Sequence, residues 1–151
     1  MGKKRLRNMT WDDYGISKNR YKELKAFCMQ YEEKKQKIEY GMRGISYDGM
    51  PGGSLSTKSP VEQQAMENMR YLKDIQMIEA VAVKTNPLIS KYLLKSVTED
   101  LSYEFIMYDA ELGRIPVGKT EFYGYRKLFY HYLNEEKIKK RKSGDKLKLL
   151  L

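Results

Sequence analysis

The feature that most constrains this chain is an aromatic, basic segment with helical spacing between residues 113 and 133. Three apolar residues, Phe122, Phe129 and Leu133, recur at intervals of seven and four, which places them on one face of an α-helix. A turn that contains proline and glycine precedes them and ends any earlier element. The pattern predicts a helix over residues 119–134. Three further residues widen its apolar stripe: Tyr125, Leu128 and Tyr132.

The polar side of this predicted helix has two interpretations. One is a recognition helix, whose first turns contact bases and phosphates while its apolar face holds it to the domain. The other is an ordinary core helix with a solvated basic face, and the spacing alone does not choose between them. The first interpretation assigns five residues off the stripe to DNA: Lys119, Thr120, Tyr123, Arg126 and Lys127.

Each of these residues has an expected role in the DNA-binding interpretation. Lys119 and Thr120 would meet phosphates or base edges at the helix start, and Arg126 is the best candidate for a bidentate contact with guanine. Alternatively, Arg126 pairs with Glu121 or Asp109, and Tyr123 belongs to the core. The residues expected to grip phosphates are Arg114, Lys137, Lys139, Lys140 and Arg141.

A phosphate-loop pattern overlaps the same stretch. Gly113, Gly118, Lys119 and Thr120 satisfy the spacing G-x-x-x-x-G-K-[ST]. That loop requires a buried parallel strand before it and further strands elsewhere, and nothing upstream has the pattern of such strands. Pro116 lies where backbone amides should cradle phosphate, and proline has no amide proton. The context argues against nucleotide binding.

The formal charge of +9 is concentrated at the two ends of the chain. Residues 1–8 carry four Lys/Arg and no acid, and residues 137–151 carry seven Lys/Arg and one Asp. Basic tails add salt-sensitive attraction to phosphates, although they also serve solubility. The run at 137–142 directly follows the predicted recognition helix, which favours double-stranded DNA as the partner.

The scarcity of cysteine and histidine excludes several function classes. Cys28 and His131 are the only residues of their types, so no disulfide within the chain and no Cys/His zinc site is expected. No carboxylate pair or Ser/His/Asp set has a structural frame around it. No apolar run approaches the roughly 18 residues that cross a membrane. We expect a cytoplasmic protein that is not an enzyme, with no metal, cofactor or membrane contact.

The rest of the chain divides into helices and one linker. We expect a basic arm and a helix capped by Ser17 in residues 1–40, and a flexible glycine-rich linker over 41–58. Ser59-Pro60-Val61-Glu62 is a strong start for a helix that continues to about Lys84. Its predicted inward stripe comprises Val61, Ala65, Met69, Leu72, Ile75, Ile78 and Ala82.

Three shorter helices are expected from Asn86 onward, over residues 87–97, 102–110 and 119–134. Phe105, Ile106 and Tyr108 are expected to face inward, although a strand over 103–108 is an alternative. This order suits a tri-helical helix-turn-helix domain. The predicted fold is therefore all-α, with N-terminal long helices as a helical hairpin or arm. Its expected divisions are 1–40, 41–58, 59–85, a helix-turn-helix domain at 86–136, and a basic tail at 137–151.

The layout resembles a family, the phage late-gene transcriptional regulators of the RinA/ArpU type. The resemblance covers about residues 59–135. It rests on Ser59-Pro60-Val61-Glu62, Tyr92-Leu93, Leu101-Ser102-Tyr103, Ile115-Pro116-Val117-Gly118-Lys119-Thr120-Glu121-Phe122-Tyr123 and Tyr125-Arg126-Lys127-Leu128-Phe129-Tyr130. It implies a C-terminal helix-turn-helix similar to that of sigma factors, DNA binding, and a role in phage or prophage gene expression inside a bacterial host.

The sequence therefore leaves three functions open. A transcriptional regulator would read duplex DNA with the helix over 119–134, and its other long helices would mediate homodimerisation or contact with host RNA polymerase. A phage packaging component similar to small terminase subunits would combine the same DNA-binding helices with oligomerisation. A phage-encoded inhibitor of a host CRISPR nuclease (an anti-CRISPR protein) would keep a helix-turn-helix for DNA.

Overall fold

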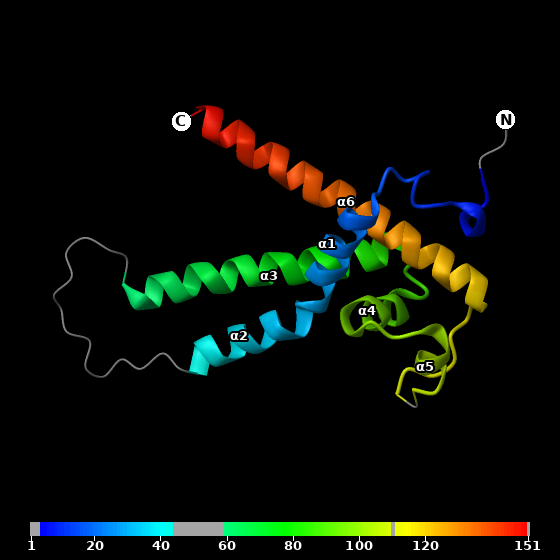
Figure 1. Cartoon of the computed structure of the whole chain (residues 1–151). Coiled ribbons are helices and arrows are strands. Elements are labelled where there is room, and N and C mark those ends of the chain that lie inside the picture. Colours follow the sequence, from blue (N-terminus) through cyan, green and yellow to red (C-terminus); the bar gives the residue numbers. More distant parts are fainter. Residues whose placement is uncertain (1–3, 44–58, 110, 151) are drawn as a thin grey trace.

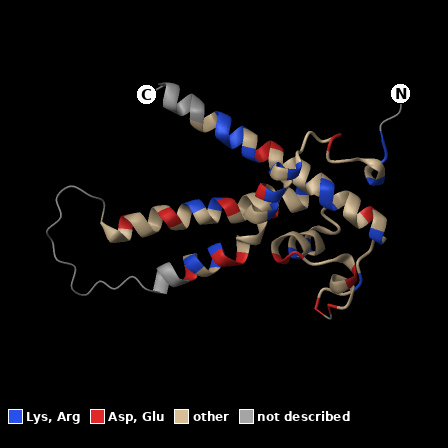
Figure 2. Cartoon of the chain, in the orientation of Figure 1, with Lys and Arg blue, Asp and Glu red and all other residues tan. Residues whose placement is uncertain are grey.

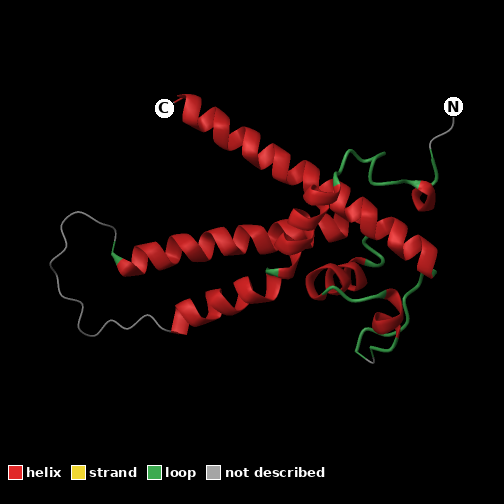
Figure 3. Cartoon of the chain, in the orientation of Figure 1, coloured by secondary structure: helices red, strands yellow, loops and turns green. Residues whose placement is uncertain are grey.

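The computed structural model describes residues 4–43, 59–109 and 111–150, and all regular structure in these ranges is helical (Figures 1 and 3). The elements are η1 (Leu6–Asn8), α1 (Lys18–Met29), α2 (Tyr31–Arg43), α3 (Pro60–Thr85), α4 (Ser90–Glu99), α5 (Tyr103–Met107) and α6 (Lys119–Leu150). The all-α prediction is confirmed. The linker prediction falls mostly on residues outside the described ranges, and its first three residues end α2.

The expected N-terminal helix begins where it was predicted, but the structure forms two helices there, α1 and α2. The Ser17 hydroxyl accepts a hydrogen bond from the Arg20 backbone N–H at 3.1 Å, so Ser17 is the cap. The chain then turns at Gln30, and α2 runs antiparallel to α3 (Figure 1). Tyr31 and Lys34 hold α2 there, because they bond to acidic residues of α3. These tertiary contacts override a helical spacing that continues through the break.

The long helix α3 confirms its predicted start but not its predicted stripe. The Ser59 hydroxyl accepts from the Glu62 backbone N–H at 3.1 Å, as in a capping box. Only its C-terminal half is buried, whereas Met69 is 61% exposed and Leu72 is 45% exposed. The N-terminal half projects with α2 away from the other helices (Figure 1). Periodicity identified the buried face of the C-terminal half, and among the described residues the same face of the N-terminal half stays exposed at Met69 and Leu72.

Helices α4 and α5 are shorter than predicted. Asn86 caps a turn by accepting from the Leu88 N–H, and α4 begins three residues late. The Ser102 cap of α5 is confirmed, and Ile106 is buried. Contrary to expectation, Phe105 is 62% exposed although it lies within α5, and Tyr108, which follows the end of α5 at Met107, is 89% exposed.

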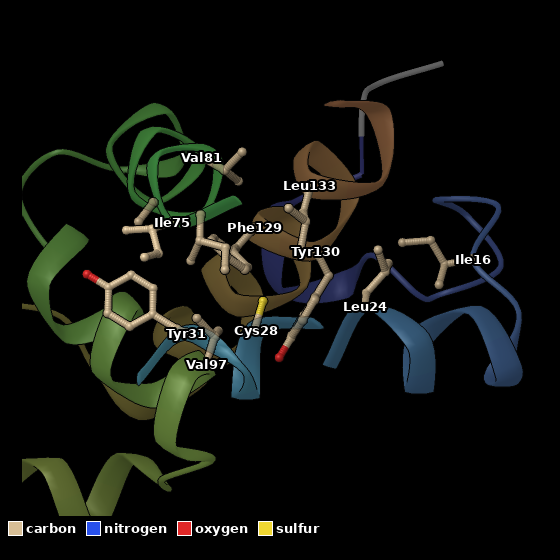
Figure 4. Packing of buried hydrophobic residues seen from close by; sticks show 12 residues of the cluster. Ile16, Leu24, Cys28, Tyr31, Ile75, Val81, Val97, Phe129, Tyr130 and Leu133 are labelled. Atoms are coloured by element: carbon tan, nitrogen blue, oxygen red, sulfur yellow. The ribbon is translucent and has the colours of Figure 1, made fainter. Parts of the chain in front are cut away.

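Helix α6 passes through both hydrophobic clusters that the described residues form. Phe122 packs in a cluster with residues of α4 and α5, while Phe129, Tyr130 and Leu133 pack in a larger cluster with α1 and α3 (Figure 4). All four side chains are completely buried, so the predicted aromatic anchor is confirmed. The helix starts at the predicted residue and then continues to Leu150, through the region expected to be a separate tail.

Gly124 gives α6 its close contact with the N-terminal segment. A Cβ at this position would lie 3.4 Å from the Leu6 side chain and 3.4 Å from its carbonyl oxygen. The segment that contains η1 therefore lies directly against the helix backbone, on part of the surface that a recognition helix leaves open.

No helix among the described residues is long and apolar enough to cross a membrane.

Candidate nucleic-acid interface

The first half of α6, beyond its first turn, is engaged by the rest of the protein. The Arg126 guanidinium donates to an Asp100 carboxylate oxygen at 3.2 Å, and its side chain is only 13% exposed. Asp100 also pairs with Lys25 of α1 at 3.1 Å. Burial by itself raises the pKa of Asp100, but the hydrogen bonds from Lys25 and Arg126 outweigh it and lower that pKa. The expectation that Arg126 faces a guanine is wrong, because it joins α6 to α4 and α1.

Two more residues assigned to DNA are also occupied. The Lys127 ammonium donates to the Met9 carbonyl at 3.2 Å and lies 5.9 Å from the centre of the Trp11 ring. The Tyr123 hydroxyl accepts from the Tyr103 backbone N–H at 3.1 Å, at the start of α5. Both are partly buried, so they position neighbouring segments rather than present a reading face.

The start of α6 remains open. Arg114, Lys119 and Thr120 are all exposed, as the DNA-binding interpretation requires. Lys119 forms an ion pair with Glu104, and both side chains are more than half exposed. Because solvent screens such a pair, it contributes little and is readily exchanged for a phosphate. This end of α6 therefore keeps one cation and one hydroxyl in its first turn.

Tyrosine hydroxyls fix the turn before α6. The Tyr103 hydroxyl donates to the Val117 carbonyl at 2.9 Å, and the Tyr92 hydroxyl lies 2.9 Å and 3.0 Å from the carbonyls of Leu112 and Arg114. A hollow of about 540 Å³ lies beside the turn. It is lined by Tyr103, Arg114, Ile115, Pro116, Val117 and Gly118.

The structure of this turn matches neither of the two patterns seen in its sequence, the helix-turn-helix and the phosphate loop. The turn separates the end of α5 at Met107 from the start of α6 at Lys119, a longer connection than the three or four residues typical of a helix-turn-helix. The phosphate-loop pattern is preceded by α5 where that loop requires a strand. The structure thus supports the argument against a nucleotide-binding loop.

The second half of α6 presents the predicted phosphate-gripping cations (Figure 2). Lys139 pairs with Glu136, and Lys140 pairs with Asp74 of α3, each at 3.4 Å. Arg141 is exposed and has no ion pair among the described residues. Lys137 is different: its ammonium lies 3.5 Å from the centre of the Phe27 ring of α1. The continuous helix, rather than a separate tail, sets the spacing of these charges.

Comparisons with protein-family models, with curated proteins and with solved structures found no match to this chain. The fold and the surface define it as an all-helical protein whose last helix is anchored through its first half and carries exposed cations in its first turn and in its second half.

Proposed function

We propose that this chain binds duplex DNA and that it regulates phage or prophage transcription. The observation that supports DNA binding is the exposed cationic surface on the second half of α6, which continues directly from the buried aromatic anchor. A rigid helix that holds cations at fixed spacing loses little side-chain and backbone freedom when it meets a phosphate backbone. The transcriptional role comes from the resemblance to the RinA/ArpU regulators.

The roles that we propose for the residues of α6 differ from the roles that the sequence suggested. Residues 86–136 contain six Lys/Arg and eight Asp/Glu, so attraction to phosphates has to come from outside the expected helix-turn-helix. In our proposal Lys139, Lys140 and Arg141 hold phosphates. Base reading falls to Arg114 and to the first turn of α6, whereas Arg126 and Lys127 keep the helix in place.

The direct test measures fluorescence anisotropy of a labelled duplex against salt concentration. Affinity should fall as salt rises from 50 to 200 mM, by about one power of the salt concentration for each phosphate neutralised. Lys139→Gln, on an exposed residue, should weaken binding to every sequence and reduce that salt slope by about one. The matched control is Lys91→Gln, an exposed lysine on α4. Affinity that is absent, or independent of salt, would overturn DNA binding.

Base reading needs a separate test. Fragments of phage and host DNA that the protein retains would first be selected and sequenced. Arg114→Gln should then lower affinity for the selected fragment more than for random DNA, because a base contact discriminates and a phosphate contact does not. Equal losses on both would remove Arg114 from the reading face.

Mass measurement by light scattering separates the regulator from the packaging alternative. A regulator should be a monomer or a homodimer, whereas a packaging subunit should be a ring of many copies. The exposed apolar side chains of Met69 and Leu72 on α3 favour self-association of some kind. Recovery of a guided nuclease instead of RNA polymerase from host lysate would favour the inhibitor.

A further inference from the structure

A hollow of about 530 Å³ lies where the start of α1 meets the second half of α6. Its lining comprises Arg20, Asn134, Lys137, Ile138 and Arg141. Three of these five side chains are cationic, and no carboxylate lines the hollow. Arg20 comes from α1 and lies more than 100 positions before the other four residues, which come from α6, so no sequence motif joins Arg20 to them.

Arg20 is held in position by its neighbours. Its Nε donates to the Asn134 side-chain oxygen at 2.8 Å, and its Nη1 donates to Glu23 at 3.2 Å. The Glu23 side chain is 67% exposed, so water screens that ion pair. The guanidinium is therefore oriented by α6 while most of its donors remain available.

Lys137 forms no ion pair with an acidic side chain among the described residues. Its ammonium lies against the Phe27 ring, and the nearby Asp74 is already bound by Lys34 at 3.0 Å and by Lys140 at 3.4 Å. Burial lowers the pKa of Lys137, and the charges of Arg20, Lys34 and Lys140 lower it further, against a smaller opposing effect of Asp74. The crossing of the helices thus has an excess of positive charge.

We propose that this hollow is a phosphate-binding site formed by Arg20, Lys137 and Arg141. A phosphate group offers several acceptor oxygens and carries one negative charge in a phosphodiester or more in a terminal phosphate, which match a guanidinium, a partly buried ammonium and a second guanidinium. Binding neutralises the repulsion around Lys137. The phosphate belongs either to the DNA backbone, in which case the site extends the proposed function, or to a free ligand such as a nucleotide.

The test uses the full chain and pyrophosphate as the probe, without DNA. The melting temperature should rise with pyrophosphate concentration and reach saturation, beyond the effect of sodium chloride at equal ionic strength. Lys137→Met keeps an apolar side chain on Phe27 and should weaken the apparent affinity about tenfold, the loss expected for one charge-assisted hydrogen bond. Arg141→Gln, on an exposed residue, should do the same without affecting folding.

Lys91→Met is the matched control, since Lys91 also lies over an aromatic ring, that of Tyr92, at 5.0 Å. It should leave pyrophosphate binding unchanged. Equal affinity in the two pocket variants and the control, or no stabilisation beyond chloride, would overturn the proposal.

A second arm identifies the source of the phosphate. If Lys137→Met weakens duplex binding more than Lys91→Met does, the site holds the DNA backbone. If pyrophosphate binding depends on Lys137 while duplex binding is absent or unchanged, the site serves a free phosphate ligand. The phosphate site stands in both cases, and failure of DNA binding alone counts only against the proposed function.

Discussion

Replacing Arg126 with alanine should destabilise the fold by about 2 kcal/mol. The hydrogen bond to Asp100 accounts for about 1 kcal/mol, because the Asp100 side chain is 38% exposed and its pair with Lys25 persists. Loss of the buried aliphatic part of Arg126, whose side chain is 13% exposed, adds about 1 kcal/mol. Urea unfolding followed by circular dichroism should show a lower midpoint with an unchanged slope.

Arg114→Ala is the control for this experiment. Arg114 is exposed at the turn before α6, so its removal should change the unfolding free energy by less than about 0.5 kcal/mol while weakening DNA binding. The Arg126 variant should show the opposite pattern, with near-normal DNA affinity while it is folded. A double-mutant cycle with Asp100→Asn should give a coupling energy of about 1 kcal/mol, and asparagine tolerates the left-handed backbone of Asp100. Normal stability with lost DNA binding in Arg126→Ala would refute this structural role.

Three further predictions concern ionisable and polar groups. Tyr130→Phe should change the unfolding free energy by less than about 1 kcal/mol, because the buried hydroxyl lies beside the Arg126 guanidinium but makes no well-formed hydrogen bond among the described residues; a larger loss in urea unfolding would contradict this. The hydrogen bond from Lys95 lowers the pKa of Asp109 below 3.8, so this group contributes stability above about pH 4 that is lost as the pH falls through its lowered folded value. Asp109→Asn should therefore reduce the loss of unfolding free energy on acidification, measured by urea unfolding at a series of pH values. Burial raises the pKa of Cys28 to about 12, so its thiol should react with iodoacetamide at neutral pH only after unfolding; fast labelling of the native protein would count against its burial.

Local chemistry accounts for the features that could be predicted from sequence. Serine hydroxyls at positions 17, 59 and 102 bond to a backbone N–H three residues ahead, and that preference requires no information from the rest of the chain. The anchors Phe122, Phe129 and Leu133 follow from helical periodicity in the same way.

The roles of the polar residues on α6 could not be predicted locally. Arg126 and Lys127 bond to residues 26 and 118 positions away, respectively. A basic side chain on a helix has the same sequence signature whether it meets a phosphate or a carboxylate. Arg20 was missed for the same reason, since its partner Asn134 is 114 positions away.

The passage of α6 through both hydrophobic clusters has a consequence for synthesis of the protein. Neither cluster is complete without this helix, because Phe122 fills one and Phe129, Tyr130 and Leu133 fill the other. While the ribosome is still translating the preceding codons, the nascent chain has no finished core in which to bury Leu93 or Ile78. We expect it to stay accessible to chaperones until the last helix emerges, and then to close both clusters in one step.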